Sequence, residues 1–269
     1  MRYLTVVSLL LLLNLGISSD GFAGIAAVHT TTNEVSGQTL TEKIFIDGDH
    51  LRFESVEDQA IFIFDAAKEV VWSINLKDKT YTEMTKADIE AVGEQVNAAM
   101  TEQQRLMEEQ LKQLPPEQRQ MMEDMMGVYM PDEKPPVVYK KIRSGEKIGT
   151  WVCDVYDGYE DDTKIETVWA ADETKLGITG HDFATLQKMA DFFAKLNPDR
   201  DEIYAYGSAE AEEKLMYSGV PVKTVTYEGD HVVETSELRQ IEETNVDAAL
   251  FKLPEGLKKV DWREQMQHN

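Results

Sequence analysis

Hydrophobic and polar residues alternate along the first third of the chain, a pattern that is typical of β-strands. From Ala26 to Met84, short alternating runs are separated by turn-forming residues. Asp47-Gly48 is a strong hairpin signal between EKIFI and LRFES. The run Ile61–Phe64 (IFIF) is apolar at every position, so we expect both faces of that strand to be covered. Further strands at Val70–Ile74 and Lys79–Met84 complete a predicted meander, which suits a curved sheet or barrel.

A helical period replaces the alternation near Ala87. Apolar residues then recur every three or four positions, at Ile89, Val92, Val96, Ala99, Met100, Leu106, Met107, Leu111 and Leu114. Pro115-Pro116 ends this helix, and the following PEQRQMMEDMM predicts a second one with proline in its first turn. Met122, Met125 and Met126 share one face of that second helix, so residues of about 86–131 are predicted to form a methionine-rich helical insertion.

Strand patterns resume after the insertion, at 137–144, 148–158 and 164–172. A helix from about Asp182 to Leu196 is expected to turn Leu186, Met189 and Phe193 inward. A second hairpin is predicted around Gly229-Asp230. No change in composition and no flexible linker divides the chain, so residues 24–269 are predicted to form a single domain with one antiparallel sheet.

The first 23 residues carry the features of an export signal. Arg2 precedes an apolar run from Tyr3 to about Ile17, and the small residues Gly21 and Ala23 have the spacing of a signal-peptidase site. The apolar run is too short for a comfortable membrane span. We therefore expect residues 1–23 to be cleaved and the protein to be periplasmic or extracellular, with an uncleaved anchor as the alternative.

Charge and cysteine content exclude several classes of protein. Fifty acidic residues against 27 basic ones give a formal net charge of −23, which disfavours nucleic acid and anionic membrane surfaces as partners. A single cysteine, Cys153, excludes an internal disulfide framework. Its alternation with Trp151 and Val155 predicts a buried, inert thiol rather than a nucleophile.

Four stretches carry a resemblance to a known family: IDGDHLRFE, VVWSINLKDKTYTEM, the pair WVCDVYDG and KIETVWAAD, and FKLPEGLKKVD. They resemble the exported bacterial family called domain of unknown function 4412, which is similar to the lipoprotein carriers LolA and LolB. The resemblance implies an α+β fold: a half-open antiparallel β-barrel with helices packed against its concave face and an apolar cavity between them. The chain departs from LolB-type proteins because it has no lipidated cysteine at the mature start, and Arg52 falls where the family pattern has an arginine.

Metal binding and catalysis have weak sequence support. Thioethers at helical spacing could hold Cu(I), but no histidine or cysteine lies in the methionine-rich stretch, and methionines at that spacing also fill apolar cores. Known catalytic motifs, including GxSxG, HExxH and the phosphate loop, are absent from the sequence. We therefore expect no enzymatic activity, no cofactor and no metal site, with Cu(I) binding by the methionine-rich helix as a minor alternative.

The sequence favours an exported, carrier-like binding protein for an apolar ligand such as the acyl chains of a lipid or lipoprotein. Flexible thioethers and aromatic rings adapt to ligands of varied shape. The predicted ligand-binding residues are Phe53, Phe62, Phe64, Trp72, Met122, Met125, Met126, Trp169 and Phe193. The alternative is a structural or interaction protein whose helices are packed permanently and whose acidic surface meets a basic envelope protein.

Overall fold

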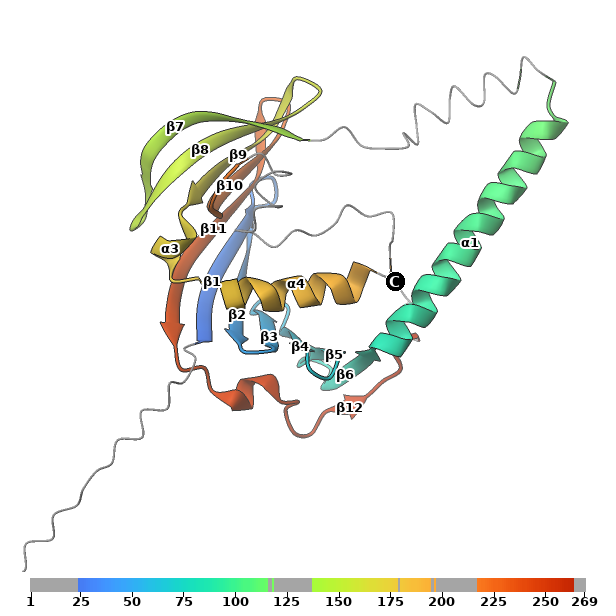
Figure 1. Ribbon diagram of the computed structural model, residues 1–269, viewed down its shortest axis with the longest axis horizontal. Helices are drawn as coiled ribbons and strands as arrows, with labels where there is room; N and C mark the ends of the chain where they lie inside the picture. Colours follow the sequence, from blue (N-terminus) through green and yellow to red (C-terminus); the bar gives the residue numbers. More distant parts are fainter. Residues whose placement is uncertain are drawn as a thin grey trace, which may run out of the picture.

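The computed structural model describes residues 24–115, 118, 137–178, 180–194, 196 and 217–263, and it organises them around one large sheet (Figure 1). The first six strands are β1 Gly24–Asn33, β2 Gln38–Asp47, β3 His50–Ser55, β4 Ala60–Asp65, β5 Val70–Asn75 and β6 Thr80–Thr85. The later strands are β7 Val138–Ile148, β8 Trp151–Glu160, β9 Thr163–Ala171, β10 Val220–Glu228, β11 His231–Thr244 and β12 Lys258–Lys259.

The strand order is β12-β6-β5-β4-β3-β2-β1-β11-β10-β9-β8-β7. Neighbouring strands are antiparallel except for the short pair of β12 with β6. The pairing of β1 with β11 joins the two halves of the chain into one sheet. Since β12 and β7 form the two edges, the described sheet is open, and it curves as expected for a large twisted sheet (Figure 1).

Both predicted hairpins are confirmed. Gly48 adopts a positive φ of 57° between β2 and β3, and Gly229 adopts 60° between β10 and β11. Glycine takes this left-handed conformation without steric cost, which explains why a tight turn forms at each position.

The two faces of β4 are covered by different parts of the chain, as its fully apolar run predicts. Phe64 packs toward helix α4 (Gly180–Ala194), on the concave side. Ile61 and Ile63 pack instead against the C-terminal segment, including the 3-10 helix η1 (Ala248–Phe251). Figure 1 shows α4 on one side of β2–β6 and η1 on the other.

The C-terminal segment is anchored to the convex face by a buried arginine. The Arg52 side chain is 8% exposed; its Nε donates to Glu54 at 2.6 Å and its Nη1 to the Leu250 carbonyl at 2.6 Å. The ring of Phe251 lies 5.2 Å from that of His50. Arg52 therefore has a structural role in this chain, because it ties η1 to strand β3.

Helix α1 (Lys86–Gln113) differs from the expectation that the helices pack against the concave face. It begins at the end of β6, and Figure 1 shows it running away from the sheet. Twenty-eight residues make a helix of about 42 Å, about twice the length of a six-residue strand. Ile89 is fully buried, whereas Val96, Met100 and Leu106 are 38%, 45% and 46% exposed. The predicted apolar stripe is present, but only its first turns pack on the sheet and α4.

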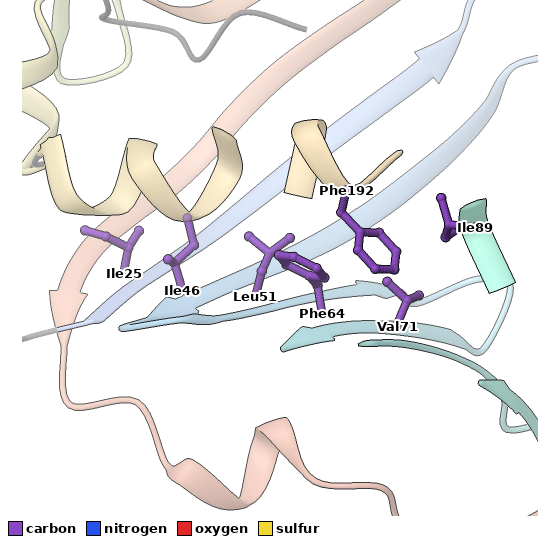
Figure 2. Close-up of a cluster of buried hydrophobic side chains, with 7 residues drawn as sticks. All are labelled: Ile25, Ile46, Leu51, Phe64, Val71, Ile89 and Phe192. Atoms are coloured by element: carbon purple, nitrogen blue, oxygen red, sulfur yellow. The ribbon is translucent and has the colours of Figure 1, made fainter. Parts of the chain in front are cut away.

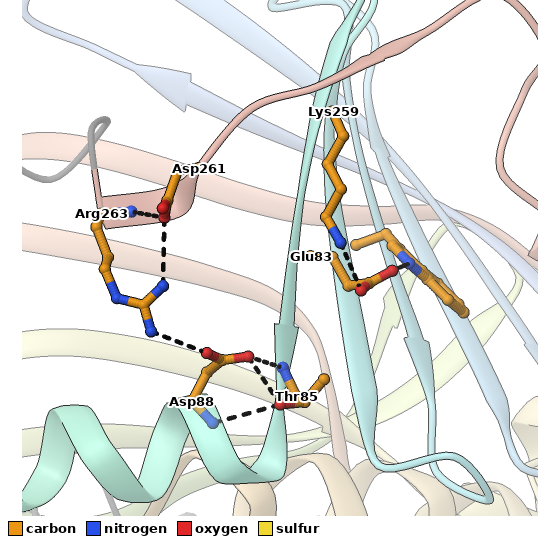
Figure 3. Close-up of polar contacts among 7 residues, drawn as sticks. Glu83, Thr85, Asp88, Lys259, Asp261 and Arg263 are labelled. Atoms are coloured by element: carbon orange, nitrogen blue, oxygen red, sulfur yellow. Dashed lines mark hydrogen bonds and ion pairs between the residues drawn. The ribbon is translucent and has the colours of Figure 1, made fainter.

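The first turn of α1 is held by a capping box and by the C-terminal segment (Figure 3). The Asp88 backbone N–H donates to Thr85 Oγ1 at 3.3 Å, and the Thr85 N–H donates to the Asp88 carboxylate at 3.0 Å. Arg263 adds an ion pair to Asp88 at 3.2 Å. Beside it, hydrogen bonds from Lys259 and Trp72 hold the pKa of Glu83 below its usual value.

Substituting Thr85→Ala should loosen this first turn. Loss of an N-cap side chain costs about 1 kcal/mol, so amide exchange in the first turn of α1 should become roughly fivefold faster. Hydrogen exchange measured by mass spectrometry checks this, with Thr32→Ala on β1 as the control. Equal exchange of the first-turn amides in both variants would show that the capping box does not hold the helix.

Candidate functional site

The candidate site is the interface between α4 and the concave face of the first half of the sheet. α4 turns Leu186, Met189, Ala190, Phe192 and Phe193 toward the strands at helical spacing. Below them, alternation along the strands places apolar residues on one face; the buried members of this group are Ile25, Ile46, Leu51, Phe64 and Val71. Figure 2 shows these side chains extending toward α4, with Phe192 pointing down between Phe64 and Val71.

A chain of phenylalanine rings crosses the interface. Phe53 and Phe62 are direct cross-strand partners, with ring centroids 6.0 Å apart. Phe62 lies 6.1 Å from Phe193 of α4, and Phe193 lies 5.1 Å from Phe192. Phe192 in turn lies 5.4 Å from Phe64. The helix and the sheet therefore meet through aromatic surface, which offers apolar contact area without hydrogen-bonding constraints.

Burial is uneven along this chain of rings. Phe64 is 1% exposed and Phe192 is 8% exposed, so this pair is closed to solvent. Phe53, Phe62 and Phe193 are only partly buried. An apolar molecule could bind against Phe53, Phe62 and Phe193, because these three rings are still partly exposed to water.

A pocket of about 280 Å³ adjoins the closed pair. Phe64 and Phe192 form its apolar wall, and its rim carries Lys86 and Lys188. Lys86 pairs with Glu69 at 2.5 Å, and Lys188 pairs with Asp49 at 2.5 Å. The pocket thus combines an aromatic wall with a rim of exposed ion pairs.

Two polar contacts attach α4 to the turn between β2 and β3. The buried Thr185 hydroxyl donates to the Gly48 carbonyl at 2.6 Å, and Lys188 Nζ forms its ion pair with Asp49. Both partners of the ion pair are about half exposed, at 50% and 42%, so the pair contributes little, about 0–1 kcal/mol. Apolar contact is the main interaction that holds α4 in place.

The structure brings together four of the predicted ligand-binding residues: Phe53, Phe62, Phe64 and Phe193. Trp72 is a correction, because it pairs with Ile63 of β4 and packs with the C-terminal segment on the opposite face. Ile63 lies between Phe62 and Phe64 on β4 and points to the opposite face of the sheet. Its cross-strand partner Trp72 therefore lies on that opposite face as well.

Trp169 also lies outside this group. It belongs to a separate cluster with Cys153, Leu176 of the short helix α3 (Glu173–Leu176) and Val222. Its indole N–H donates to Glu146 at 3.0 Å. Met122, Met125 and Met126 lie outside the described residues, so their predicted contribution is not placed.

Several residues of the interface were missed as site residues. Leu51 and Ile46 are buried beneath α4, and Leu186 and Met189 face them from the helix. Alternation from Phe53 points to Leu51, and the inner side predicted for α4 already contained Leu186 and Met189. Strand alternation and helical periodicity could therefore have identified them, but the predicted site took only aromatic residues from the strands and from α4.

Reactive and metal-binding groups are sparse in the described part of the chain. Within these residues, no three side chains of His, Cys, Asp or Glu gather as metal ligands. Cys153 is buried, as predicted, and burial raises the pKa of its thiol. None of the described helices is long and apolar enough to cross a membrane.

Comparisons with known proteins establish no family for the chain. No family model matches it, and no curated protein gives a significant match. Among solved structures, an uncharacterized conserved protein from Thermus thermophilus is 8% identical, with a TM-score of 0.43 over 89% of this chain and 91% of that chain. A LolA superfamily protein from Nitrosomonas europaea is 7% identical, with a TM-score of 0.27 over 86% of this chain and 89% of that chain. These TM-scores are too low to establish a shared fold, and the resemblance to the domain of unknown function 4412 stays a prediction.

Proposed function

We propose that this protein is an exported, non-enzymatic binding protein that holds an apolar ligand between α4 and the concave face of β2–β4. The ligand class is a molecule with an extended apolar part, such as an acyl chain of a lipid or lipoprotein. The observation that carries the proposal is the row of partly buried rings of Phe53, Phe62 and Phe193 at this interface.

Helix α4 serves as the cover of the site. Thr185 and Lys188 attach it to the turn between β2 and β3, and its contacts with the strands in the hydrophobic cluster are apolar surfaces that a ligand can replace. An acyl chain inserted beside Phe62 exchanges ring–ring contacts for ring–chain contacts at little cost, since both bury apolar area. Binding then stabilises the displaced position of α4 by the difference in ligand affinity between the two positions.

Permanent packing of α4 is the competing function, and one observation favours it. Phe64 and Phe192 are already closed to solvent, as in an ordinary core. A permanently packed helix would make this a structural or interaction protein, with the acidic surface meeting a basic envelope partner. Cu(I) binding by Met122, Met125 and Met126 is the third prediction, and it falls on residues outside the described part of the chain.

A neutral fluorescent probe distinguishes ligand binding from permanent packing. N-phenyl-1-naphthylamine gains fluorescence in apolar sites and carries no charge, so the acidity of the protein does not repel it. We expect the wild-type chain to bind the probe and Phe62→Gln to bind it at least roughly tenfold more weakly, because a polar amide replaces a central ring. Val152→Gln is the matched control, since Val152 is 58% exposed on β8 and lies outside the site.

The outcomes separate the two functions. Probe binding that Phe62→Gln weakens at least roughly tenfold and Val152→Gln preserves supports a ligand site covered by α4. No probe binding by a folded wild-type chain supports permanent packing. Circular dichroism on all three proteins ensures that loss of the probe signal is not loss of the fold.

Export is part of the proposal and is tested separately. Cleavage after residue 23 would leave a chain that starts at Gly24, the first residue of β1. The intact mass of the protein recovered from the periplasmic or culture fraction of an expressing bacterium should match residues 24–269. Recovery of the uncleaved chain in the membrane fraction would favour an anchor.

A further inference from the structure

A second pocket lies on the other half of the sheet, lined by residues of β1, β7, β9, β10 and β11 and by Tyr217 just before β10. Its volume is about 430 Å³, and none of the phenylalanines of the first site lines it. Its described wall includes the aromatic rings of Tyr139 and Tyr217, the carboxylates of Glu166 and Glu234, and the polar pair His29 and Ser236. The combination of rings and carboxylates differs from the apolar surface beneath α4.

The charge of this pocket is entirely negative among its described lining residues. Glu166 and Glu234 are the charged groups, and neither lysine nor arginine lines it. The basic residues of β9, β10 and β11 form ion pairs with other carboxylates. Lys223 of β10 lies 2.8 Å from Glu237, Arg239 of β11 also pairs with Glu237, and Lys164 of β9 lies 2.8 Å from Asp157.

His29 adds no positive charge at neutral pH. Burial lowers the pKa of its imidazole, an effect that outweighs the opposing carboxylates of Glu42 and Glu234, and Arg239 lowers it further. Its Nε2 lies 2.8 Å from Ser236 Oγ, which holds the neutral ring in place. His29 therefore does not offset the carboxylates among the described lining residues of the pocket.

The aromatic wall is made of rings that pack against one another. Tyr217 is 7% exposed, and its ring lies edge-on to Tyr139 at 4.8 Å and tilted against Tyr156 at 5.5 Å. The Tyr139 hydroxyl donates to Glu166, so one carboxylate is fixed beside the aromatic surface. Aromatic faces next to carboxylates attract organic cations through the ring quadrupole and direct charge attraction.

We propose that this pocket binds a compact organic cation, an amine or a quaternary ammonium group. The volume suits a small polar molecule, and the preformed rings and carboxylates supply the two interactions that such a cation needs. This inference does not depend on the apolar ligand proposed for the first site.

Choline and its neutral isostere 3,3-dimethylbutan-1-ol test the proposal directly, because they have nearly the same shape and differ in charge. Ligand-observed NMR titration of the full chain at pH 7.5 should show choline binding roughly tenfold or more tightly than the neutral alcohol. Equal affinity for both molecules, or no binding of choline, would overturn the proposal.

Two variants locate the site. Glu234→Gln removes a lining carboxylate that is exposed on β11 and should weaken choline binding several-fold. Glu228→Gln changes an exposed carboxylate at the end of β10 that does not line the pocket, and it should leave binding unchanged. Equal weakening by both variants would show attraction to the overall acidic surface and would refute a specific pocket.

Discussion

Phe64→Ala should lower the free energy of unfolding by about 3–5 kcal/mol, the cost of removing a large buried ring and leaving a cavity. Phe64 is 1% exposed and contacts Phe192 of α4 at a centroid distance of 5.4 Å. The substitution therefore removes the central contact between α4 and the sheet. Urea unfolding followed by circular dichroism and tryptophan fluorescence measures the change.

Val152→Ala is the control for this prediction. Val152 is 58% exposed on β8, so its truncation should change the free energy of unfolding by no more than about 0.5 kcal/mol. If Phe64→Ala lowers the free energy of unfolding by less than about 1 kcal/mol, the placement of Phe64 beneath α4 is contradicted, because truncating a buried phenylalanine costs more than that.

Arg52→Met should lower the free energy of unfolding by about 3 kcal/mol. The substitution keeps an apolar stem of similar length, but it leaves Glu54 and the Leu250 carbonyl without their 2.6 Å donor. This loss is at the low end of what breaking a buried ion pair costs, because the Glu54 side chain is 21% exposed and can still reach water. Chemical denaturation measures the loss, and hydrogen exchange should be faster in η1.

Arg143→Met provides the matched comparison. Arg143 also pairs with a glutamate, Glu146 at 2.9 Å, but its side chain is 57% exposed. Surface ion pairs contribute about 0–1 kcal/mol, so this variant should stay close to wild type. Equal stability of the two variants would mean that Arg52 does not anchor the C-terminal segment.

Local structure in the first half of the sheet could be predicted from the sequence because its signals are local. Asp47-Gly48 predicted a turn that the structure confirms. The fully apolar run IFIF predicted a strand buried on both faces, and α4 and the C-terminal segment cover those faces. The helical periods correctly predicted α1 and α4. Turn chemistry and periodicity depend on neighbouring residues, so one sequence is enough to reveal them.

The face on which a side chain lies was harder to predict. Trp72 was grouped with Phe62 and Phe64, although β4 is apolar on both sides and offers no local sign of which side is concave. The pairing of β4 with β5 places Trp72 beside Ile63, on the face covered by η1. Only the long-range packing of α4 and the C-terminal segment distinguishes the two faces.

Contacts between distant parts of the chain were not predictable from local pattern. The stripe on α1 predicted an apolar face but not that Met100 would be exposed. The pocket that contains His29 and Ser236 depends on the pairing of β1 with β11, which are 207 residues apart at this contact. Nothing in the local sequence of either strand indicates that pairing, so the second pocket could not be inferred beforehand.

Native mass spectrometry of the mature chain, purified without detergent from its own compartment, tests the central claim most directly. The account predicts bound masses that differ by methylene units, as acyl chains do, and their loss in Phe62→Gln but not in Val152→Gln. A folded wild-type protein that shows the polypeptide mass alone, or adducts retained equally by both variants, would contradict an apolar ligand beneath α4.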